Sequence, residues 1–415
     1  MTHDPGQVIV GASAAGVAAA VAMRTAGYDR PITVVDSDPH QPYERPPLSK
    51  ALLGVAGEQA LKPILPEEVY RIHRIDLRLG IGVTGLDLRT HRVTLDDGGV
   101  LPASHVILTT GVAARRLPVP GADLANVLTL RDADDARALS TQLAAGGPLV
   151  IIGGGFIGLE LAAVARENDV EVTVVELCRL PLVGVMGPEV AELVHRLHTD
   201  RGVHFRVGVT VSAFVGTPAV EAVELDDGEL LPAQTVVVGV GVVPRVALAD
   251  AAGITVDRFG IVVDRLGRTS NPWVSAAGDG ASQPHPALPA PGRIEHWDVA
   301  QRHGAAVGTS VVGAATPFEA TPYAWSEQYG LMLQMFGRPH PGDELVLRRG
   351  ATPERFLAFW LRAGRVGAVA GLDLPRDVAA ARRFIDTAAT VPVAQLADPD
   401  VDMRRLVKDL ASATK

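Results

Sequence analysis

Short runs of apolar residues recur along the chain, several of them just before glycine-rich turns. These strand-like runs are VIVG at 8–11, ITVVD at 32–36, HVILTTG at 105–111, LVIIGGG at 149–155, EVTVVE at 171–176 and TVVVGVG at 235–241. Alanine-rich stretches of helical character lie between several of them. Segments 8–36 and 149–176 both follow the order strand, turn, helix, strand, which indicates an internally duplicated βαβ unit.

A polar strand pair follows each of these units. The sequences are HRVTLDDGGVL at 91–101 and AVELDDGELL at 222–231, where Asp-Gly or Gly-Gly supplies the hairpin turn. From about residue 320 the pattern changes to strands rich in arginine and aromatic residues, followed by a charged helix. The pattern predicts an α/β chain with two Rossmann-like domains and a C-terminal α+β domain.

The first glycine-rich turn is Gly11-Ala12-Ser13-Ala14-Ala15-Gly16, which follows a strand and opens a helix. Glycine permits the sharp turn, and the helix N-terminus offers free N–H groups to a pyrophosphate. Ser13 replaces the usual middle glycine. Asp36 ends the next strand, 20 residues beyond Gly16, at the spacing expected for a carboxylate that binds ribose hydroxyls. The alternative is a small-residue turn that merely closes a βα unit.

The second turn, Gly153-Gly154-Gly155-Phe156-Ile157-Gly158, carries the complete fingerprint of a dinucleotide site, and Glu176 ends the following strand. A carboxylate at this position accepts a ribose diol and repels a 2′-phosphate, so Glu176 favours NADH over NADPH. Arg179, three residues further on, could tolerate a 2′-phosphate if it swings inward.

A third element, Ala276-Ala277-Gly278-Asp279-Gly280, follows another apolar run. An aspartate beside a glycine at a strand end can bind the ribityl hydroxyls of a flavin. A simple Gly-Asp turn is the alternative, and the position after two nucleotide units favours the flavin.

Composition excludes several classes of function. The net charge of −9 and the 4% of aromatic residues argue against a nucleic-acid surface. The single cysteine, Cys178, excludes an internal disulfide and a cysteine-based metal cluster. No basic leader and no apolar window of roughly 18 residues is present, so we expect a cytoplasmic protein without a membrane span.

Two further stretches, PYERPPLSK at 42–50 and WSEQYG at 325–330, narrow the assignment. With the three elements above, they resemble the NADH-dependent ferredoxin reductases of oxygenase systems, the putidaredoxin reductase and biphenyl dioxygenase ferredoxin reductase group of the two-dinucleotide-binding FAD flavoproteins. The resemblance covers residues 7–407 and implies a glutathione-reductase-like fold. It implies FAD bound by 1–112 and 245–319, NAD bound by 113–244, and a C-terminal interface domain at 320–415.

The resemblance also implies roles for individual residues. Lys50 and Glu160 would form an ion pair beside flavin N5, and Trp325 would flank the nicotinamide pocket; these three are the predicted catalytic residues. Val83 would contact adenine through its backbone, and Arg131 would approach FAD. The other residues predicted to bind a cofactor, besides those of the two turns, Asp36 and Glu176, are Arg45, Lys50, Thr110, Gly111, Gly278, Asp279, Glu295, His296, Trp297, Glu160 and Gly241. A surface lysine, a solvated helix glutamate and a core tryptophan are the structural alternatives.

The implied function is hydride transfer from NADH to FAD, followed by electron transfer to a [2Fe–2S] ferredoxin that supplies a cytochrome P450 or a Rieske-type oxygenase. The stretch after the first βαβ unit, where related disulfide reductases and peroxidases carry a redox cysteine, reads YERPPLSKALLG and holds none. We expect a monomer or weak homodimer. Basic residues expected near the flavin edge, as candidates for docking an acidic ferredoxin, are Arg293, Arg302, Arg338, His340 and Arg348.

Two alternatives stay open. The first is an NADH oxidase or another pyridine-nucleotide flavoprotein with a different acceptor, such as rubredoxin or O₂. The second is a flavoprotein that functions by interaction and resembles apoptosis-inducing factor. That reading expects targeting segments and a basic DNA-binding surface, neither of which is seen.

Overall fold

A computed structural model describes residues 5–53, 60–352 and 354–413. The chain folds into two compact units, each assembled from separate stretches of sequence. The first unit comprises 1–45, 61–113 and 242–322, and the second comprises 46–60, 114–241 and 323–415. None of the described helices is both long enough and apolar enough to span a membrane.

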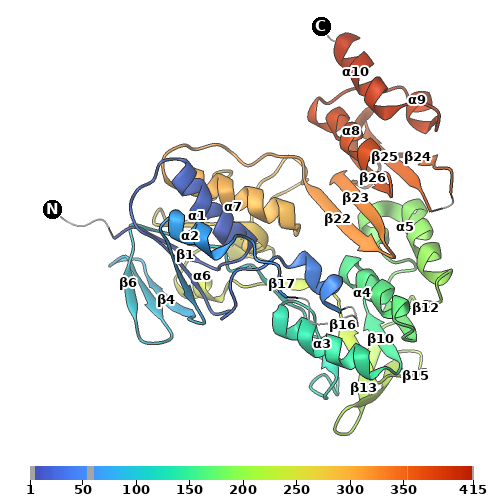
Figure 1. Ribbon diagram of the computed structural model, residues 1–415, viewed down its shortest axis with the longest axis horizontal. Coiled ribbons are helices and arrows are strands. Elements are labelled where there is room, and N and C mark those ends of the chain that lie inside the picture. Colours follow the sequence, from blue (N-terminus) through green and yellow to red (C-terminus); the bar gives the residue numbers. More distant parts are fainter. Residues whose placement is uncertain (1–4, 54–59, 353, 414–415) are drawn as a thin grey trace. The chain divides into compact units, whose positions relative to one another are not determined.

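The first unit is built around a five-stranded parallel sheet (Figure 1). Its strands, in spatial order, are β20 (Val274–Ala276), β7 (His105–Leu108), β1 (Gln7–Val10), β2 (Ile32–Asp36) and β3 (Ile75–Leu79). The three central strands, β7, β1 and β2, are largely buried and mostly apolar because both faces of a parallel sheet are covered, whereas the edge strand β3 also carries Asp76 and Arg78.

Helices α1 (Ala14–Thr25) and α7 (Trp297–Val311) pack tightly on each other in this unit. A Cβ atom at Gly304 would lie 2.1 Å from the carbonyl oxygen of Ala15, and one at Gly308 would lie 2.4 Å from that of Ala19. The two glycines, one helical turn apart, therefore let the helix backbones touch, which fixes the N-terminus of α1 beside α7.

Smaller elements complete the first unit. They are α2 (Glu67–Ile72), the antiparallel sheet β4 (Val83–Asp87), β5 (Arg92–Leu95) and β6 (Val100–Pro102), the pair β8 (Val112–Ala114) and β17 (Val242–Pro244), helix α6 (Ala247–Ala251), the sheet β18 (Val256–Asp257), β19 (Gly260–Val262) and β21 (Ala281–Ser282), and the 3₁₀ turn η3 (Gly278–Gly280).

The second unit repeats the parallel sheet. Its strands, in spatial order, are β12 (His204–Val207), β11 (Val172–Glu176), β10 (Leu149–Ile152), β16 (Thr235–Val238) and β9 (Val127–Leu128). The associated elements are α3 (Ala133–Ala145), α4 (Phe156–Glu167), α5 (Val183–Thr199), the antiparallel sheet β13 (Val211–Gly216), β14 (Val220–Leu225) and β15 (Leu230–Pro232), and the short 3₁₀ turns η1 (Pro46–Ser49) and η2 (Ala51–Leu53).

The same unit contains a five-stranded antiparallel sheet, visible in orange and red in Figure 1. Its order is β22 (Tyr323–Gln328), β23 (Leu331–Gly337), β26 (Arg365–Leu372), β25 (Phe356–Arg362) and β24 (Glu344–Arg349), with helices α8 (Pro375–Asp386), α9 (Val393–Ala397) and α10 (Met403–Ala413). Its side chains alternate between faces. Phe359 packs with Phe384 of α8, whereas Trp360 packs with Leu159 of α4 and Val194 of α5.

The C-terminal antiparallel sheet thus shares a hydrophobic core with α4 and α5, which are associated with the parallel sheet of the second unit. The predicted duplication of the βαβ unit is present, since β1–α1–β2 and β10–α4–β11 have the same order and the same parallel pairing. The three-domain division stays a prediction: the two units divide the chain differently and place 46–60 with the second sheet.

Candidate functional site

The turn between β1 and α1 is shaped to approach a ligand closely. Gly11 has φ +110°, and a Cβ atom at Gly16 would lie 1.9 Å from the Gly11 carbonyl oxygen, so both positions require glycine. Ser13 is the N-cap of α1, but its hydroxyl makes no capping hydrogen bond; it accepts one of 3.2 Å from Nε of Arg45. The first-turn N–H groups of α1 are thus left without a side-chain cap, which suits an anion.

Asp36 ends β2 and organises this turn. Its Oδ2 atom accepts a hydrogen bond of 2.5 Å from the N–H of Ala12, and its Oδ1 atom accepts one of 2.9 Å from the N–H of Asp38. A pocket next to this carboxylate lies entirely within the first unit. Its lining residues are Ala12, Ser13, Asp36, Asp38, His40, Pro42, Tyr43 and Arg45.

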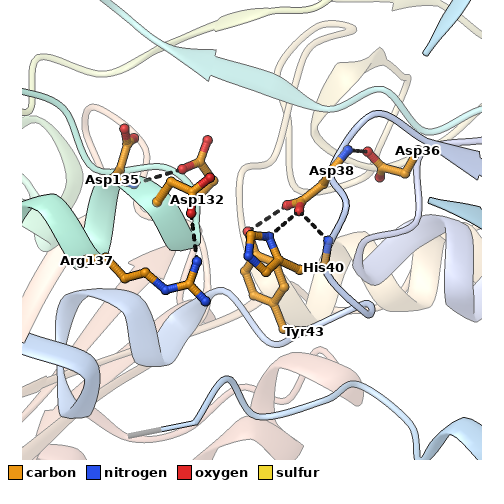
Figure 2. Close-up of polar contacts among 8 residues, drawn as sticks. Asp36, Asp38, His40, Tyr43, Asp132, Asp135 and Arg137 are labelled. Carbon is orange, nitrogen blue, oxygen red and sulfur yellow. Dashed lines mark hydrogen bonds and ion pairs between the residues drawn. The ribbon is translucent and has the colours of Figure 1, made fainter. Parts of the chain in front are cut away.

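Asp38 stiffens the wall of that pocket (Figure 2). Its Oδ1 atom lies 2.7 Å from Nδ1 of His40, and its Oδ2 atom accepts a hydrogen bond of 3.0 Å from the hydroxyl of Tyr43. Burial alone would raise the pKa of Asp38, but hydrogen bonds from the backbone and ring of His40 and from Tyr43 hold this pKa below its ordinary value. The carboxylate therefore stays charged and keeps the 38–43 loop in place.

The third sequence element meets the same turn. Gly278 has φ +77°, and a Cβ atom there would lie 2.8 Å from the side chain of Ala15 in α1. The Gly278 N–H donates a hydrogen bond of 3.2 Å to Nδ1 of His303. His303 is buried, and burial lowers its pKa to about 3, so it is neutral and can accept this bond. The structure thus brings Gly278, the residue before Asp279, to the N-terminus of α1, and the binding of a ribityl chain by Asp279 stays a prediction.

Trp297, the first residue of α7, packs against Ala14 and Ala15 of α1. It is half-buried, so its ring both supports the turn and reaches the surface of the unit. Its neighbours differ: His296 is the N-cap of α7, whereas Glu295 is exposed and forms an ion pair of 2.8 Å with Arg293.

Of the remaining predicted residues of the first unit, Val83 lies on a strand, and Thr110 and Gly111 lie in the loop between β7 and β8. Val83 begins β4 and is half-buried. The Thr110 hydroxyl donates a hydrogen bond of 2.8 Å to the carbonyl oxygen of Arg245. The carbonyl oxygen of Gly111 accepts a hydrogen bond of 3.0 Å from the N–H of Arg245. A Cβ atom at Gly280 would lie 3.0 Å from the Gly111 carbonyl oxygen, which joins this loop to the third element.

The second turn, between β10 and α4, repeats this geometry. Gly153 has φ +106°, and a Cβ atom at Gly158 would lie 2.2 Å from the Gly153 carbonyl oxygen. Glu176 accepts a hydrogen bond of 2.7 Å from the N–H of Gly154. Gly155 is the N-cap of α4, and no heavy atom lies within 4 Å of a Cβ built there. Apart from the chain neighbours of Gly155, the space next to this position is therefore open; of the two residues that follow, Phe156 is half-buried and Ile157 is exposed.

Lys50 and Glu160 form an ion pair within the second unit. Nζ of Lys50 lies 2.8 Å from Oε2 of Glu160 and donates a second hydrogen bond of 3.1 Å to the carbonyl oxygen of Pro46. Glu160 is 4% exposed, so its carboxylate is buried and requires these partners. The Ser49 hydroxyl donates a hydrogen bond to the same Oε2 atom, and the Ser326 hydroxyl donates a hydrogen bond of 2.7 Å to Oε1 of Glu160.

Trp325 lies next to Ser326 on β22 but on the opposite face of the strand. Its ring stacks on Tyr323 with centroids 5.5 Å apart, and its side chain is half-buried. The structure therefore brings Ser326, not Trp325, to the Lys50–Glu160 pair.

Arg131 and Gly241 border the second sheet. The backbone N–H of Arg131 donates a hydrogen bond of 2.7 Å to the carboxylate of Asp135. Burial and the nearby charge of Asp132 raise the pKa of Asp135. Figure 2 shows Asp132 and Asp135 at the start of α3. Gly241 has φ +93°, and its carbonyl oxygen accepts a hydrogen bond of 3.0 Å from the N–H of Arg115.

One docking candidate is wrong. Arg348 is 6% exposed, and its guanidinium donates to the carbonyl oxygens of Leu396, Val401 and Gln395. It is a structural residue that fastens α9 and the following loop to β24. The pattern misled because β24 alternates inward and outward, and Arg348 falls on the inward side. Of the other candidates, Arg338 is exposed, Arg302 and His340 are half-buried, and Arg293 is largely covered and paired with Glu295.

Cys178 is exposed beside Glu176, and its pKa is raised by partial burial, by the Glu176 charge and by a hydrogen bond to that carboxylate. It has the character of an unreactive thiol. Across residues 5–53, 60–352 and 354–413, no group of three or more histidine, cysteine or acidic side chains is placed to hold a metal ion.

Sequence reasoning missed five side chains that organise these sites: Ser49, His198, His303, Ser326 and Gln328. Two of the stretches were already singled out, since PPLSK contains Ser49 and WSEQYG contains Ser326 and Gln328. Serine and glutamine next to a predicted catalytic lysine or tryptophan were the available signal. The two histidines had none, because an isolated histidine on a helix does not identify its partner.

Residues 6–304 match the family model described as pyridine nucleotide-disulphide oxidoreductase, and residues 323–407 match the model described as reductase C-terminal. The chain is similar to rhodocoxin reductase of Rhodococcus erythropolis, with 38% identity covering 96% of this chain and 93% of the relative. It is also similar to the ferredoxin reductase component of chlorobenzene dioxygenase from Cupriavidus sp. (strain PS12), with 38% identity covering 96% of this chain and 97% of the relative.

Two solved structures show the same likeness in three dimensions. The ferredoxin reductase for the CYP199A2 system from Rhodopseudomonas palustris has a TM-score of 0.93 at 33% identity and covers 97% of this chain and 100% of its own. The reductase in the covalent putidaredoxin reductase–putidaredoxin complex has a TM-score of 0.92 at 33% identity, covering 98% and 99%.

Proposed function

The chain belongs to the pyridine nucleotide-disulphide oxidoreductase family, and from this premise we propose that it is an NADH-dependent ferredoxin reductase. Membership confirms the resemblance and the fold class that the sequence predicted. The observation that carries the proposal is the occurrence, in one chain, of two turns with the same carboxylate-braced geometry, in a protein that matches ferredoxin reductases over nearly its full length.

The first turn fits FAD. Gly11 and Gly16 leave no room for a larger residue, the N-terminus of α1 has no side-chain cap, and Gly278 lies against Ala15. The backbone N–H groups of residues 13–15 would hold the pyrophosphate, Asp36 the adenosine ribose, and Asp279 the ribityl chain. Arg45 would neutralise phosphate charge from its position on Ser13. FAD, when bound, supplies an acceptor for hydride and a donor of single electrons.

The second turn fits NADH. Gly155 leaves the N-terminus of α4 open, and Glu176 offers a carboxylate at the end of β11. That carboxylate would accept hydrogen bonds from the ribose diol and repel a 2′-phosphate. Cys178 stays a bystander, because its raised pKa keeps it a thiol.

Lys50, Glu160 and Trp325 would act at the reacting rings. The Lys50 ammonium supplies positive charge close to the reacting ring, and Glu160 restrains that ammonium through the 2.8 Å ion pair so that it leaves room for the nicotinamide. Trp325 would shield the nicotinamide with its half-buried indole. Hydride transfer needs the two rings stacked within about 3.5 Å without water between them, so positioning is the main task of these side chains.

The acceptor we propose is a [2Fe–2S] ferredoxin that supplies a P450 or a Rieske-type oxygenase. Relatives named as reductase components of dioxygenase systems support it, as does a structural neighbour solved together with putidaredoxin. The absence of cysteine from residues 42–53 argues against a thiol relay. Arg302, Arg338 and His340 remain the docking candidates for an acidic ferredoxin.

A steady-state assay tests the proposal. NADH oxidation is measured with O₂ alone, with rubredoxin, and with a [2Fe–2S] ferredoxin plus cytochrome c, and ferredoxin is expected to support the fastest turnover. Raising the ionic strength should slow ferredoxin reduction steeply and leave ferricyanide reduction nearly unchanged. Equal turnover with O₂ alone would assign the chain to the oxidases instead.

A further inference from the structure

A line of buried polar side chains runs through the second unit, away from the Lys50–Glu160 pair. Exposed fractions are 4% for Glu160, 0% for Ser326, 1% for Gln328 and 0% for His198. These residues come from α4, β22 and α5, which pack together around an otherwise apolar core. Polar groups in such a core destabilise the fold unless they are all paired, so their retention needs an explanation.

The contacts form an unbroken chain. Ser326 Oγ lies 2.7 Å from Oε1 of Glu160, and Nε2 of Gln328 lies 3.0 Å from Ser326 Oγ. Oε1 of Gln328 lies 2.8 Å from Nε2 of His198, and the Tyr329 hydroxyl lies 3.0 Å from Nδ1 of the same ring. Ser326, Gln328 and His198 thus each have a hydrogen-bond partner on either side.

Chemistry fixes the direction of every bond in this chain. A charged carboxylate only accepts, so the Ser326 hydroxyl must donate to Glu160. That hydroxyl has one proton, so Gln328 must donate its amide N–H to Ser326 and present its oxygen to His198. The His198 ring must therefore carry its proton on Nε2. Burial lowers the pKa of His198 to about 4, so the ring is neutral and its Nδ1 can accept from Tyr329.

The chain of hydrogen bonds ends at the carboxylate of Glu160, which accepts the last of them from Ser326. Ser326 holds Oε1, while Oε2 receives both Lys50 and Ser49. With both oxygens engaged, the carboxylate cannot rotate, and the ammonium of Lys50 has one favourable position. Without Ser326, one carboxylate oxygen would lose its neutral donor, and Lys50 could move between the two oxygens.

We propose that Ser326, Gln328 and His198 are positioning residues that orient Glu160 toward Lys50 through a one-way chain of hydrogen bonds ending in the Nε2–H tautomer of His198. The inference rests on the proposed role of the Lys50–Glu160 pair in flavin reduction. It assigns the serine and glutamine of the WSEQYG stretch a function separate from that of Trp325, which faces the other side of β22.

The first experiment reads the tautomer directly. The FAD-loaded protein is labelled with ¹⁵N-histidine, and the resonances of His198 are assigned by their loss in His198→Gln. The proposal predicts a pure Nε2–H tautomer in the unmodified protein and a mixture or the Nδ1–H form in Gln328→Met. An Nδ1–H tautomer in the unmodified protein would overturn the proposed direction of the chain, and this result does not depend on activity.

The second experiment is a double-mutant cycle on flavin reduction by NADH, followed by stopped flow. Ser326→Ala should slow the reduction about tenfold with little change in the apparent Kd of NADH, and Ser326→Thr, which keeps the hydroxyl, should restore most of the rate. In a Lys50→Met background, Ser326→Ala should have no further effect. An equal slowing in both backgrounds would mean that Ser326 acts only on the fold.

A matched control separates this effect from the loss of any buried hydroxyl. Thr235 on β16 is buried in the same unit, and its hydroxyl has no hydrogen-bond partner among the described residues. Thr235→Val should therefore leave flavin reduction unchanged, and a tenfold loss there would count against the proposal. If Lys50→Met itself left the rate of flavin reduction unchanged, the proposed role of the Lys50–Glu160 pair would fail. The tautomer of His198 would still test the direction of the hydrogen-bond chain.

Discussion

Glu176 accepts a hydrogen bond of 2.7 Å from the backbone N–H of Gly154, so one carboxylate oxygen braces the glycine-rich turn. The other carboxylate oxygen of Glu176 accepts a hydrogen bond of 2.7 Å from the N–H of Cys178. Both oxygens retain acceptor capacity, because each carboxylate oxygen has two lone pairs. The residue proposed to recognise the ribose therefore also fixes the turn that receives the pyrophosphate.

The first prediction concerns the choice of nucleotide. Glu176→Gln removes the charge that repels a 2′-phosphate, so the ratio of kcat/KM for NADH to that for NADPH should fall at least about tenfold, or about 1.4 kcal/mol. Steady-state kinetics with both nucleotides measure the ratio. Glu189→Gln, an exposed carboxylate on α5, is the control and should leave it unchanged. An unaltered ratio in Glu176→Gln would remove this residue as the determinant.

The second prediction separates two glycines of one turn. Gly155→Ala meets no atom within 4 Å and should fold normally, yet its methyl group should obstruct the pyrophosphate and raise the KM for NADH. Gly158→Ala would place a Cβ atom 2.2 Å from the Gly153 carbonyl oxygen and should lower the melting temperature. Thermal unfolding and NADH kinetics on both variants check this. Normal NADH kinetics in a stably folded Gly155→Ala would contradict the proposed site.

The third prediction concerns acid stability. Burial lowers the pKa of His303 to about 3, below the value of about 6.5 expected for the unfolded chain. The unfolded state therefore binds more protons, and His303 contributes stability that is complete above about pH 6.5 and is lost as pH falls toward 3. His303→Asn keeps an acceptor for the Gly278 N–H but does not titrate.

The readout is the slope of the unfolding free energy against pH between 6.5 and 4. His303→Asn should flatten it by at most about 1.4 kcal/mol per pH unit, whatever its effect on absolute stability. His204→Asn, at an exposed position on β12, serves as the comparison and should keep the original slope. Parallel curves for His303→Asn and the unmodified protein would mean that this ring does not stay neutral.

The fourth prediction distinguishes two arginines. Arg348→Leu removes three hydrogen bonds to carbonyl oxygens and should lower the free energy of unfolding by about 3 kcal/mol. Arg338→Ala, at an exposed position, should change stability by less than about 0.5 kcal/mol while weakening ferredoxin reduction at low salt. Denaturant unfolding and cytochrome c-coupled assays test the two effects. Normal ferredoxin kinetics in Arg338→Ala would remove it as a docking residue.

Local pattern was enough to predict most of the fold. The strands, the two turns and the βαβ duplication follow from apolar runs, glycine spacing and terminal carboxylates, all of which act over fewer than about 40 residues. The assignment of 46–60 to the second unit was not predictable in this way, because it depends on contacts such as that of Lys50 with Glu160 across 110 residues.

The same limit explains the errors at the site. Strand alternation alone does not show that Arg348 is buried, because the face of β24 on which it lies is covered by α9, which is distant in the sequence. His303 and His198 hold Gly278 and Gln328 through contacts between distant segments. Close approach of helices, by contrast, leaves a local trace, and the Gly304–Gly308 spacing in α7 is one that could have been read.

Anaerobic stopped-flow reduction of the purified protein tests the central claim most directly. The account predicts a yellow, FAD-containing protein whose flavin absorbance is bleached rapidly by NADH, much more slowly by NADPH, and restored when oxidised [2Fe–2S] ferredoxin is added. A protein that bound no flavin, or a flavin that NADH reduced but ferredoxin left reduced, would contradict it.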